Sequence, residues 1–134
     1  MEIMVENVGG LKVAASFKDY TITTDQSVKN GGEGSGPEPF DLFLASIATC
    51  AGYYVYEFCL HRKISTAGIG LVLRTEKNEK TKMLDKILVE IQLPQDFPAK
   101  YEKAVVRAAD LCTVKKHLVD PPAIKLYATR AVAG

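Results

Sequence analysis

The sequence predicts an α+β fold in a single domain, and three observations support this class. Stretches rich in β-branched and aromatic residues come before a long apolar run, two more follow it, and a stretch with helical spacing comes later. The 134 residues are enough to bury one core, so we treat 1–134 as one domain. The expected order of elements is βββ-α-ββ-α-β.

Three strands are expected in the first part of the chain. Residues 3–8 and 11–17 flank Gly9-Gly10, a pair typical of a tight hairpin turn. Residues 19–25 alternate and are rich in Thr, Tyr and Ile, which favours a third strand.

A glycine-rich loop is expected over residues 26–38. It does not resemble a phosphate-binding loop, because Gly36 is followed by Pro37-Glu38 rather than by Lys and Ser or Thr. We therefore interpret it as a flexible flap beside an active site.

A long helix is predicted from about Pro39 to Arg62, because proline suits the first turn and Asp41 favours the positive end of the helix dipole. Its apolar run, Phe40–Leu60, is hydrophobic on all sides. One short domain covers only part of such a helix, so we expect a homodimer. A membrane span would fit by length, but Asp41 and Glu57 are costly in a bilayer, so no membrane insertion is expected.

The second half of the chain repeats the same kinds of signal. Alternating apolar positions predict strands, and steps of three and four residues predict a helix that Pro94 and Pro98 introduce. The remaining expected elements are a strand at 69–76, a turn at 77–82, a strand at 84–93, a helix at 99–111, a short helix within 112–119 and a last strand at 123–128.

Composition and charge exclude several classes of partner. The 17 basic and 16 acidic residues give a net charge of +1, which offers no electrostatic surface for nucleic acid.

Residues 1–11 lack the apolar core of a signal peptide. Three cysteines cannot form a complete disulfide framework, so we expect a cytoplasmic protein with free thiols.

The cysteines are the main candidates for chemistry. Cys50 lies within the apolar run, and Cys112 stands where a further helix could begin, a place that lowers the pKa of a thiol. Taken alone, each could also be a small buried hydrophobic residue, and Cys59 is expected to belong to the core. Cys112 and His117 do not share a helical face, so no metal site is expected.

Aromatic and aliphatic side chains could form an apolar pocket next to Cys50. Phe43, Ile47 and Tyr54 share a helical face with that thiol, because three- and four-residue steps separate them. Together with Phe40, these residues are the candidate substrate contacts.

Three segments of the chain resemble the OsmC/Ohr proteins, the osmotically inducible and organic hydroperoxide resistance family. These are Gly36-Pro37-Glu38-Pro39-Phe40-Asp41-Leu42-Phe43-Leu44-Ala45, Ala48-Thr49-Cys50, and Leu111-Cys112-Thr113-Val114. The resemblance implies an OsmC-like fold, with central helices wrapped by sheets in an intertwined homodimer. It also implies a thiol peroxidase of organic hydroperoxides in oxidative-stress defence, with Cys50 peroxidatic and Cys112 resolving. The implied reductant is a dithiol, lipoyl in parts of the family, and no cofactor is implied.

The chain departs from the family's well-known peroxidases at the group that activates the cysteine. Those proteins use an Arg–Glu pair, whereas Phe40 stands at the Glu position and residues 1–61 contain no Arg. Some other cation is therefore expected near Cys50. The candidates are Lys12, Lys18, Lys29, Arg62, Arg74 and Arg107. The alternative function is non-catalytic: binding of a small apolar or thiol-bearing ligand, or redox sensing.

Overall fold

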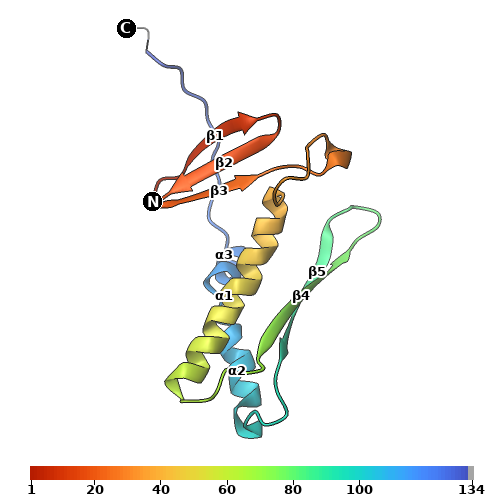
Figure 1. Cartoon of the computed structure of the whole chain (residues 1–134), viewed down its shortest axis with the longest axis vertical. Coiled ribbons are helices and arrows are strands. Elements are labelled where there is room, and N and C mark those ends of the chain that lie inside the picture. Colours follow the sequence, from red (N-terminus) through yellow and green to blue (C-terminus); the bar gives the residue numbers. More distant parts are fainter. Residues whose placement is uncertain (133–134) are drawn as a thin grey trace.

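A 23-residue helix runs through the structure and organises the elements around it (Figure 1). The structure, a computed structural model, describes residues 1–132. Its strands are β1 (Met4–Gly9), β2 (Lys12–Phe17), β3 (Tyr20–Thr24), β4 (Gly70–Lys77) and β5 (Leu84–Gln92). Its helices are η1 (Val28–Asn30), α1 (Pro39–His61), η2 (Ala99–Tyr101), α2 (Glu102–Ala109) and α3 (Thr113–Val119), where η marks a short 3-10 helix.

The central helix α1 begins and ends close to the predicted residues. The Asp41 carboxylate accepts a hydrogen bond from the backbone N–H of Glu38 (2.9 Å), which satisfies a donor at the start of the helix. Pro39 occupies the first turn, where its missing N–H costs nothing. The helix ends at His61, one residue before the predicted end.

The strands form two separate antiparallel sheets, one beyond the start of α1 and one beside it (Figure 1). The strands β1, β2 and β3 form a meander, and β4 pairs with β5 in a hairpin alongside α1. The predicted hairpin turn is confirmed: Gly9 pairs with Lys12, and both Gly9 and Gly10 have positive φ angles that glycine adopts without strain.

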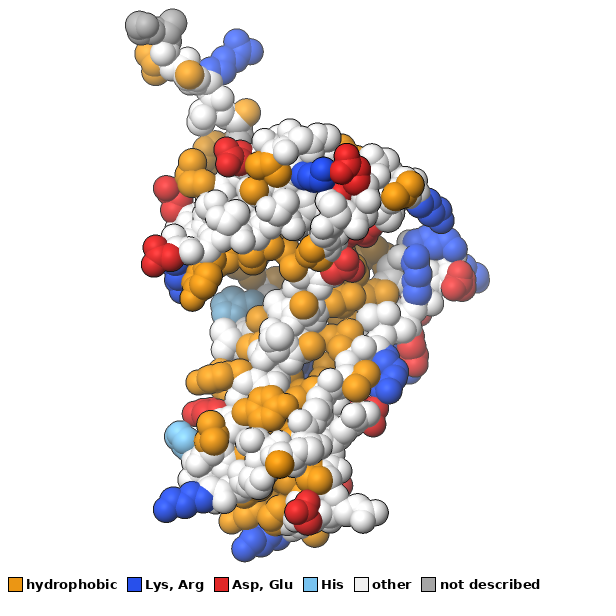
Figure 2. All heavy atoms as spheres, in the orientation of Figure 1, with side chains coloured by type: hydrophobic (Ala, Val, Ile, Leu, Met, Phe, Trp, Pro, Cys, Tyr) orange, Lys and Arg blue, Asp and Glu red, His pale blue; other side chains and the backbone are white. Residues whose placement is uncertain are grey.

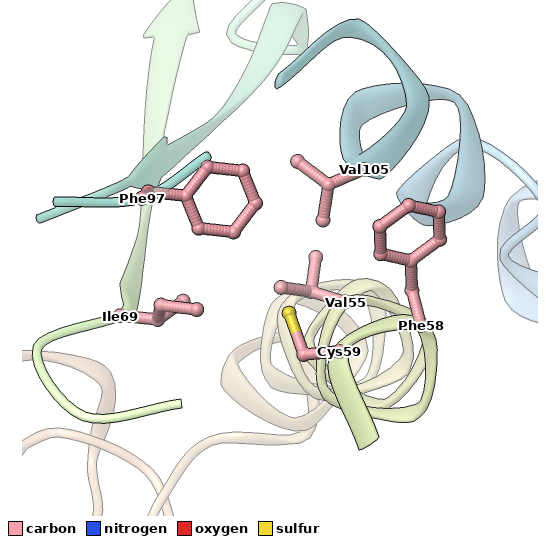
Figure 3. Close-up of a cluster of buried hydrophobic side chains, with 6 residues drawn as sticks. All are labelled: Val55, Phe58, Cys59, Ile69, Phe97 and Val105. Atoms are coloured by element: carbon pink, nitrogen blue, oxygen red, sulfur yellow. The ribbon is translucent and has the colours of Figure 1, made fainter. Parts of the chain in front are cut away.

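The hydrophobic core lies between α1, α2 and the loops on either side of the β4–β5 hairpin. Figure 3 shows Val55, Phe58 and Cys59 of α1 pointing towards Ile69, Phe97 and the Val105 side chain of α2. Cys59 has no exposed surface, and burial raises the pKa of its thiol. The prediction that Cys59 belongs to the core is therefore confirmed.

The glycine-rich loop closes onto Asp25, a side chain that is 1% exposed. Its carboxylate accepts hydrogen bonds from the backbone N–H groups of Gln26 (2.7 Å), Glu33 (3.2 Å) and Ser35 (3.1 Å), and from the Ser35 hydroxyl (2.7 Å). A Cβ atom at Gly32 would lie only 2.1 Å from the carbonyl oxygen of Gln26. The loop that we expected to be a flexible flap is thus held by one buried carboxylate.

The last predicted strand, at 123–128, is wrong for the single chain. These residues form no strand, and all of them are exposed. The segment leaves α3 and extends past the N-terminal sheet without pairing with it (Figure 1). A strand needs a neighbour with which it exchanges backbone hydrogen bonds, and this segment pairs with none among residues 1–132. The short helix expected within 112–119 is confirmed as α3.

The helix α1 is long and apolar enough to cross a membrane by length and composition. This is only a weak indication, because the core helix of a soluble protein passes the same test. Here α1 contributes side chains to the core and packs against α2, α3 and β4.

Candidate active site

The structure brings Cys50 and Cys112 into contact, although they are far apart in the sequence. Cys50 lies near the middle of α1 and is partly exposed, whereas Cys112 immediately precedes α3 and is 2% exposed. The two thiols lie close enough for each to shift the pKa of the other. The packing of α3 against α1 creates this pair.

The surroundings of Cys50 favour its thiolate. Burial raises the pKa of this thiol, but hydrogen bonds from the Val114 N–H, the Cys112 thiol and the Thr113 N–H together outweigh that effect. The pKa of Cys50 therefore lies below its ordinary value, because each of these donors stabilises the negatively charged sulfur.

Cys112 is shifted in the opposite direction. Burial raises the pKa of its thiol, and the adjacent Cys50 raises it further, both through their hydrogen bond and through its charge. The backbone N–H of Lys115 donates to Cys112 Sγ (3.4 Å) and opposes these effects only in part. Cys50 is thus the first of the pair to lose its proton.

Within residues 1–132, no cationic side chain contributes to the lowered pKa of Cys50. An activating cation from elsewhere in a dimer stays a prediction. Backbone N–H groups supply the stabilisation instead. Several candidate cations are occupied elsewhere: Lys12 pairs with Glu33, Arg74 pairs with Glu90, and Arg62 stacks over the Phe58 ring.

The Tyr54 hydroxyl joins α1 to the start of α3. It lies 3.0 Å from the Thr113 hydroxyl, within hydrogen-bond distance. Thr113 directly follows Cys112, and its own N–H reaches Cys50. Tyr54, which we expected to contact substrate, therefore also fixes the segment that carries the donors to Cys50.

An apolar groove of about 460 Å³ lies beside the cysteine pair. It passes between α1, β5, α2 and α3, and Cys112 forms part of its wall, whereas Cys50 does not. Its apolar side chains are Ile47, Ala51, Ile87, Val89, Ile91, Val106, Ala109 and Leu118. Three charged residues complete the lining: Arg107, Asp110 and Lys115.

The expected substrate contacts are divided between different places. Ile47 is buried and lines the groove. Phe40 and Phe43 stack on each other near the start of α1, with ring centroids 5.2 Å apart, and do not line it. A larger hollow of about 550 Å³, lined by Lys115, Lys116, Asp120 and neighbours, touches neither cysteine.

Potential metal ligands do not gather in the structure. Among residues 1–132, no group of three or more His, Cys, Asp or Glu side chains could hold a metal ion. His117 Nδ1 is instead hydrogen-bonded to the Thr113 carbonyl oxygen (2.7 Å).

Sequence reasoning missed the backbone donors of Thr113 and Val114. The only signal was the expected helix start at Cys112, which we took to lower the pKa of Cys112 itself. The helix does begin there, but its first N–H groups face Cys50 on α1. The position of the helix was predictable from the sequence, but the sequence did not show that the helix start lowers the pKa of Cys50 rather than that of Cys112.

The family of the chain follows from residues 32–127, which match the model for OsmC-like proteins. This match spans most of the chain and includes both Cys50 and Cys112. The chain therefore belongs to the OsmC-like family, whose members are linked to redox and peroxide chemistry. No curated protein matches the chain.

Solved structures share the fold at low sequence identity. A Psychrobacter arcticus 273-4 protein assigned to osmotic stress and detoxification responses is 24% identical, with a TM-score of 0.72 over 85% of each chain. A hypothetical protein from Aquifex aeolicus VF5 is 22% identical, with a TM-score of 0.64 over 90% of this chain and 87% of its own. An organic hydroperoxide resistance protein OsmC from Legionella pneumophila is 20% identical, with a TM-score of 0.53 over 88% and 89%.

Proposed function

We propose that this chain is a thiol-dependent peroxidase that reduces organic hydroperoxides, with Cys50 as the attacking thiol and Cys112 as the resolving thiol. The observation that carries the proposal is the contact between two thiols whose pKa values are shifted in opposite directions. Only a thiolate attacks a peroxide, and the hydrogen bonds favour the thiolate of Cys50. Membership of the OsmC-like family supports the same chemistry.

The protein contributes only its two sulfurs to the reaction. The Cys50 thiolate attacks the distal peroxide oxygen, the O–O bond breaks, and the alcohol leaves after taking up a proton. The Cys50 sulfenic acid then condenses with Cys112, releasing water and forming a disulfide. A dithiol restores both thiols by exchange, so the cycle requires no cofactor.

The hydroperoxide is proposed to reach Cys50 along the face of α1 that also carries Phe43 and Tyr54. The stacked rings of Phe40 and Phe43 provide apolar surface towards the start of that helix. The active form in this proposal is a homodimer, because much of the apolar surface of α1 lies uncovered in the single chain. We place it in the cytoplasm, because its cysteines are free thiols.

Rapid mixing with cumene hydroperoxide or hydrogen peroxide, followed by acid quenching and intact-mass analysis, tests the proposal. The wild type should form one internal disulfide. The reaction should be at least about tenfold faster with cumene hydroperoxide than with hydrogen peroxide, since ~1.4 kcal/mol of binding energy from the apolar group corresponds to a factor of ten. Cys112→Ser should stop at a dimedone-reactive sulfenic acid on Cys50.

The matched variants give a clear contradiction. Cys50→Ser should abolish peroxide consumption, whereas Cys59→Ser should retain it, because Cys59 lies in the core away from the pair. Equal oxidation of wild type and Cys50→Ser would refute the peroxidase assignment.

The second candidate function is a thiol-based redox sensor or binding protein. It is favoured by one observation: no cationic side chain within residues 1–132 adds to the stabilisation of the Cys50 thiolate. Repeating the rapid-mixing experiment with an excess of dithiol separates the two functions. A sensor forms one disulfide per chain, but the dithiol reduces that disulfide too slowly for repeated turnover.

A further inference from the structure

Cys50 and Cys112 are also two soft metal ligands that lie next to each other. Cys50 is partly exposed, so an ion can approach it from solvent, while Cys112 is 2% exposed. Throughout the part of the chain that the structure describes, His, Cys, Asp and Glu side chains form no metal-binding group of three or more. An ion at this pair would therefore be held by two sulfurs and by no third side chain of these types.

The number and kind of ligands decide which ions fit. Zn²⁺ in a structural site takes four protein ligands, and Ca²⁺ and Mg²⁺ take oxygen ligands. Thiolates select soft ions such as Cu(I). Monovalent ions of this class are stable with two thiolates in a line, so a pair of cysteines satisfies them without further ligands.

The donors around the pair favour a monovalent ion. Two thiolates around such an ion leave one negative charge on the complex. The backbone N–H groups of Thr113 and Val114 are directed at Cys50, and the Lys115 N–H donates to Cys112 Sγ (3.4 Å). Converging N–H groups stabilise an anion, so the site suits this charged complex better than the neutral complex of a divalent ion.

We propose that Cys50 and Cys112 form a two-coordinate site for a soft monovalent cation of the Cu(I) class, bound between their Sγ atoms. Each coordinated sulfur gives up its proton to solvent, and no electron is transferred. This binding does not depend on the proposed peroxidase function, because it needs only the two reduced sulfurs and no peroxide.

The separation that an ion requires is larger than the one that a disulfide requires. Sulfurs on opposite sides of an ion lie roughly 4.6 Å apart, taking about 2.3 Å for each metal–sulfur bond as in zinc sites. A disulfide brings the two sulfurs to about 2.0 Å. Metal binding therefore draws α1 and α3 together less than oxidation of the pair does.

A competition titration measures the affinity for the ion. The reduced full chain is added, without oxygen, to Cu(I) bound to the coloured chelator bicinchoninate, and loss of colour reports transfer of the ion. We expect one ion per chain. The affinity should fall at least about 100-fold in Cys50→Ser and in Cys112→Ser, since losing even an outer partner of a metal ligand costs roughly 10–100-fold.

Two controls show whether the pair itself binds the ion. Cys59→Ala removes the third thiol, which is buried in the core, and should bind Cu(I) like the wild type. Zn²⁺ at about tenfold excess should not displace Cu(I), because the pair offers only two of the four ligands that Zn²⁺ takes. Bound Cu(I) should also protect Cys50 from maleimide, as peptide mass analysis can show.

The role of the N–H groups is tested with Thr113→Pro. Thr113 is the first residue of α3, where proline fits a helix, and Cys112 before it has a ψ of 119°, close to the range that precedes proline. The variant removes an N–H directed at Cys50 and should lower the Cu(I) affinity roughly tenfold. Thr113→Val also lacks the hydroxyl but keeps the N–H, so it should lose less.

Several results would overturn the site. Cu(I) that stays on the chelator, or tight binding that persists in Cys50→Ser, shows that the pair does not hold the ion. One ion per two chains shows that Cu(I) bridges copies instead. Equal affinities of Thr113→Pro and Thr113→Val would remove the role of the N–H group. Since the titration contains no peroxide, each of these results leaves the peroxidase proposal to its own test.

Discussion

Cys50 and Cys112 differ because of their surroundings. The same few atoms at the start of α3 lower the pKa of Cys50, while burial keeps the pKa of Cys112 high. A sequence shows charged side chains but not the directions of N–H groups, and we therefore expected a lysine or arginine in this role. The contact between the cysteines was suggested by the family resemblance, because residue spacing alone does not determine how α3 packs on α1.

Tyr54→Phe should weaken the hold of α3 on α1 and raise the pKa of Cys50. Losing one hydrogen bond costs about 1 kcal/mol, which corresponds to a rise of roughly half to one pKa unit if it is fully transmitted. The thiolate fraction at neutral pH then falls, so alkylation of Cys50 should slow about three- to tenfold. The measurement is the pH dependence of iodoacetamide labelling at Cys50, followed by mass spectrometry.

The Thr113 partner supplies the controls for this prediction. Thr113→Val should reproduce the shift, Thr113→Ser should restore normal labelling, and Thr113→Val combined with Tyr54→Phe should add little. Tyr53→Phe alters an exposed neighbouring ring and should leave the profile unchanged. An unchanged Cys50 profile in Tyr54→Phe would show that this hydrogen bond does not position the donors.

At the scale of elements, the sequence predicted best those whose signals are local. The hairpin at Gly9-Gly10 and the start of α1 at Pro39 follow from turn chemistry and proline geometry, and both are confirmed. The strand at 123–128 failed, because pairing depends on a neighbour that residue patterns do not identify. The closure of the glycine loop was also missed, since it depends on the Asp25 carboxylate contacting Glu33 and Ser35, eight and ten residues further along the chain.

Asp25 should make the stability of this loop depend on acid. The Ser35 hydroxyl and the Ser35, Gln26 and Glu33 N–H groups lower the pKa of Asp25 to about 2, below the ordinary 3.8. The folded state therefore binds its proton less readily than the unfolded state. Its stabilising effect is complete above about pH 4 and is lost as the pH falls towards 2.

Asp25→Asn should lower the Tm at neutral pH and flatten the change in Tm between pH 4 and pH 2. Thermal unfolding followed by circular dichroism at a series of pH values is the measurement. Asp19→Asn, in the exposed turn between β2 and β3, is the matched control and should follow the wild-type curve. Identical pH profiles for wild type and Asp25→Asn would contradict this role of the carboxylate.

At the scale of the whole molecule, many large apolar side chains are exposed in the single chain. The strand β1 is exposed along its full length, and hydrophobic side chains are visible over the body beneath the N-terminal sheet (Figure 2). On α1, Tyr53 and Leu60 are 60% and 68% exposed. In the segment after α3, Ile124, Leu126 and Tyr127 are each more than four-fifths exposed.

These exposed surfaces bear on two predictions from the sequence: the homodimer and the strand at 123–128. The all-round apolar pattern of Phe40–Leu60 predicted a covering partner, and a single chain does leave part of that helix uncovered. Residues 123–128, which follow Pro121-Pro122, were predicted to form a strand, and in the single chain this segment is exposed and unpaired. A second copy would satisfy both patterns if this segment added to a sheet edge of the partner.

The last prediction is that the chain sediments as a dimer at micromolar concentration. A variant truncated after Pro122 should form this dimer with much lower affinity. Burying Ile124 and Leu126 alone would contribute about 3 kcal/mol or more, at 1.5–3 kcal/mol per large apolar side chain. The dissociation constant should then rise by roughly 100-fold or more, since ~1.4 kcal/mol corresponds to a factor of ten. Leu60→Glu should also weaken association, whereas Met83→Glu, a similarly exposed residue at the β4–β5 turn, should not. A wild-type chain that remains a stable monomer would contradict the dimer, and dimerisation unaffected by the truncation would exclude the segment from the interface.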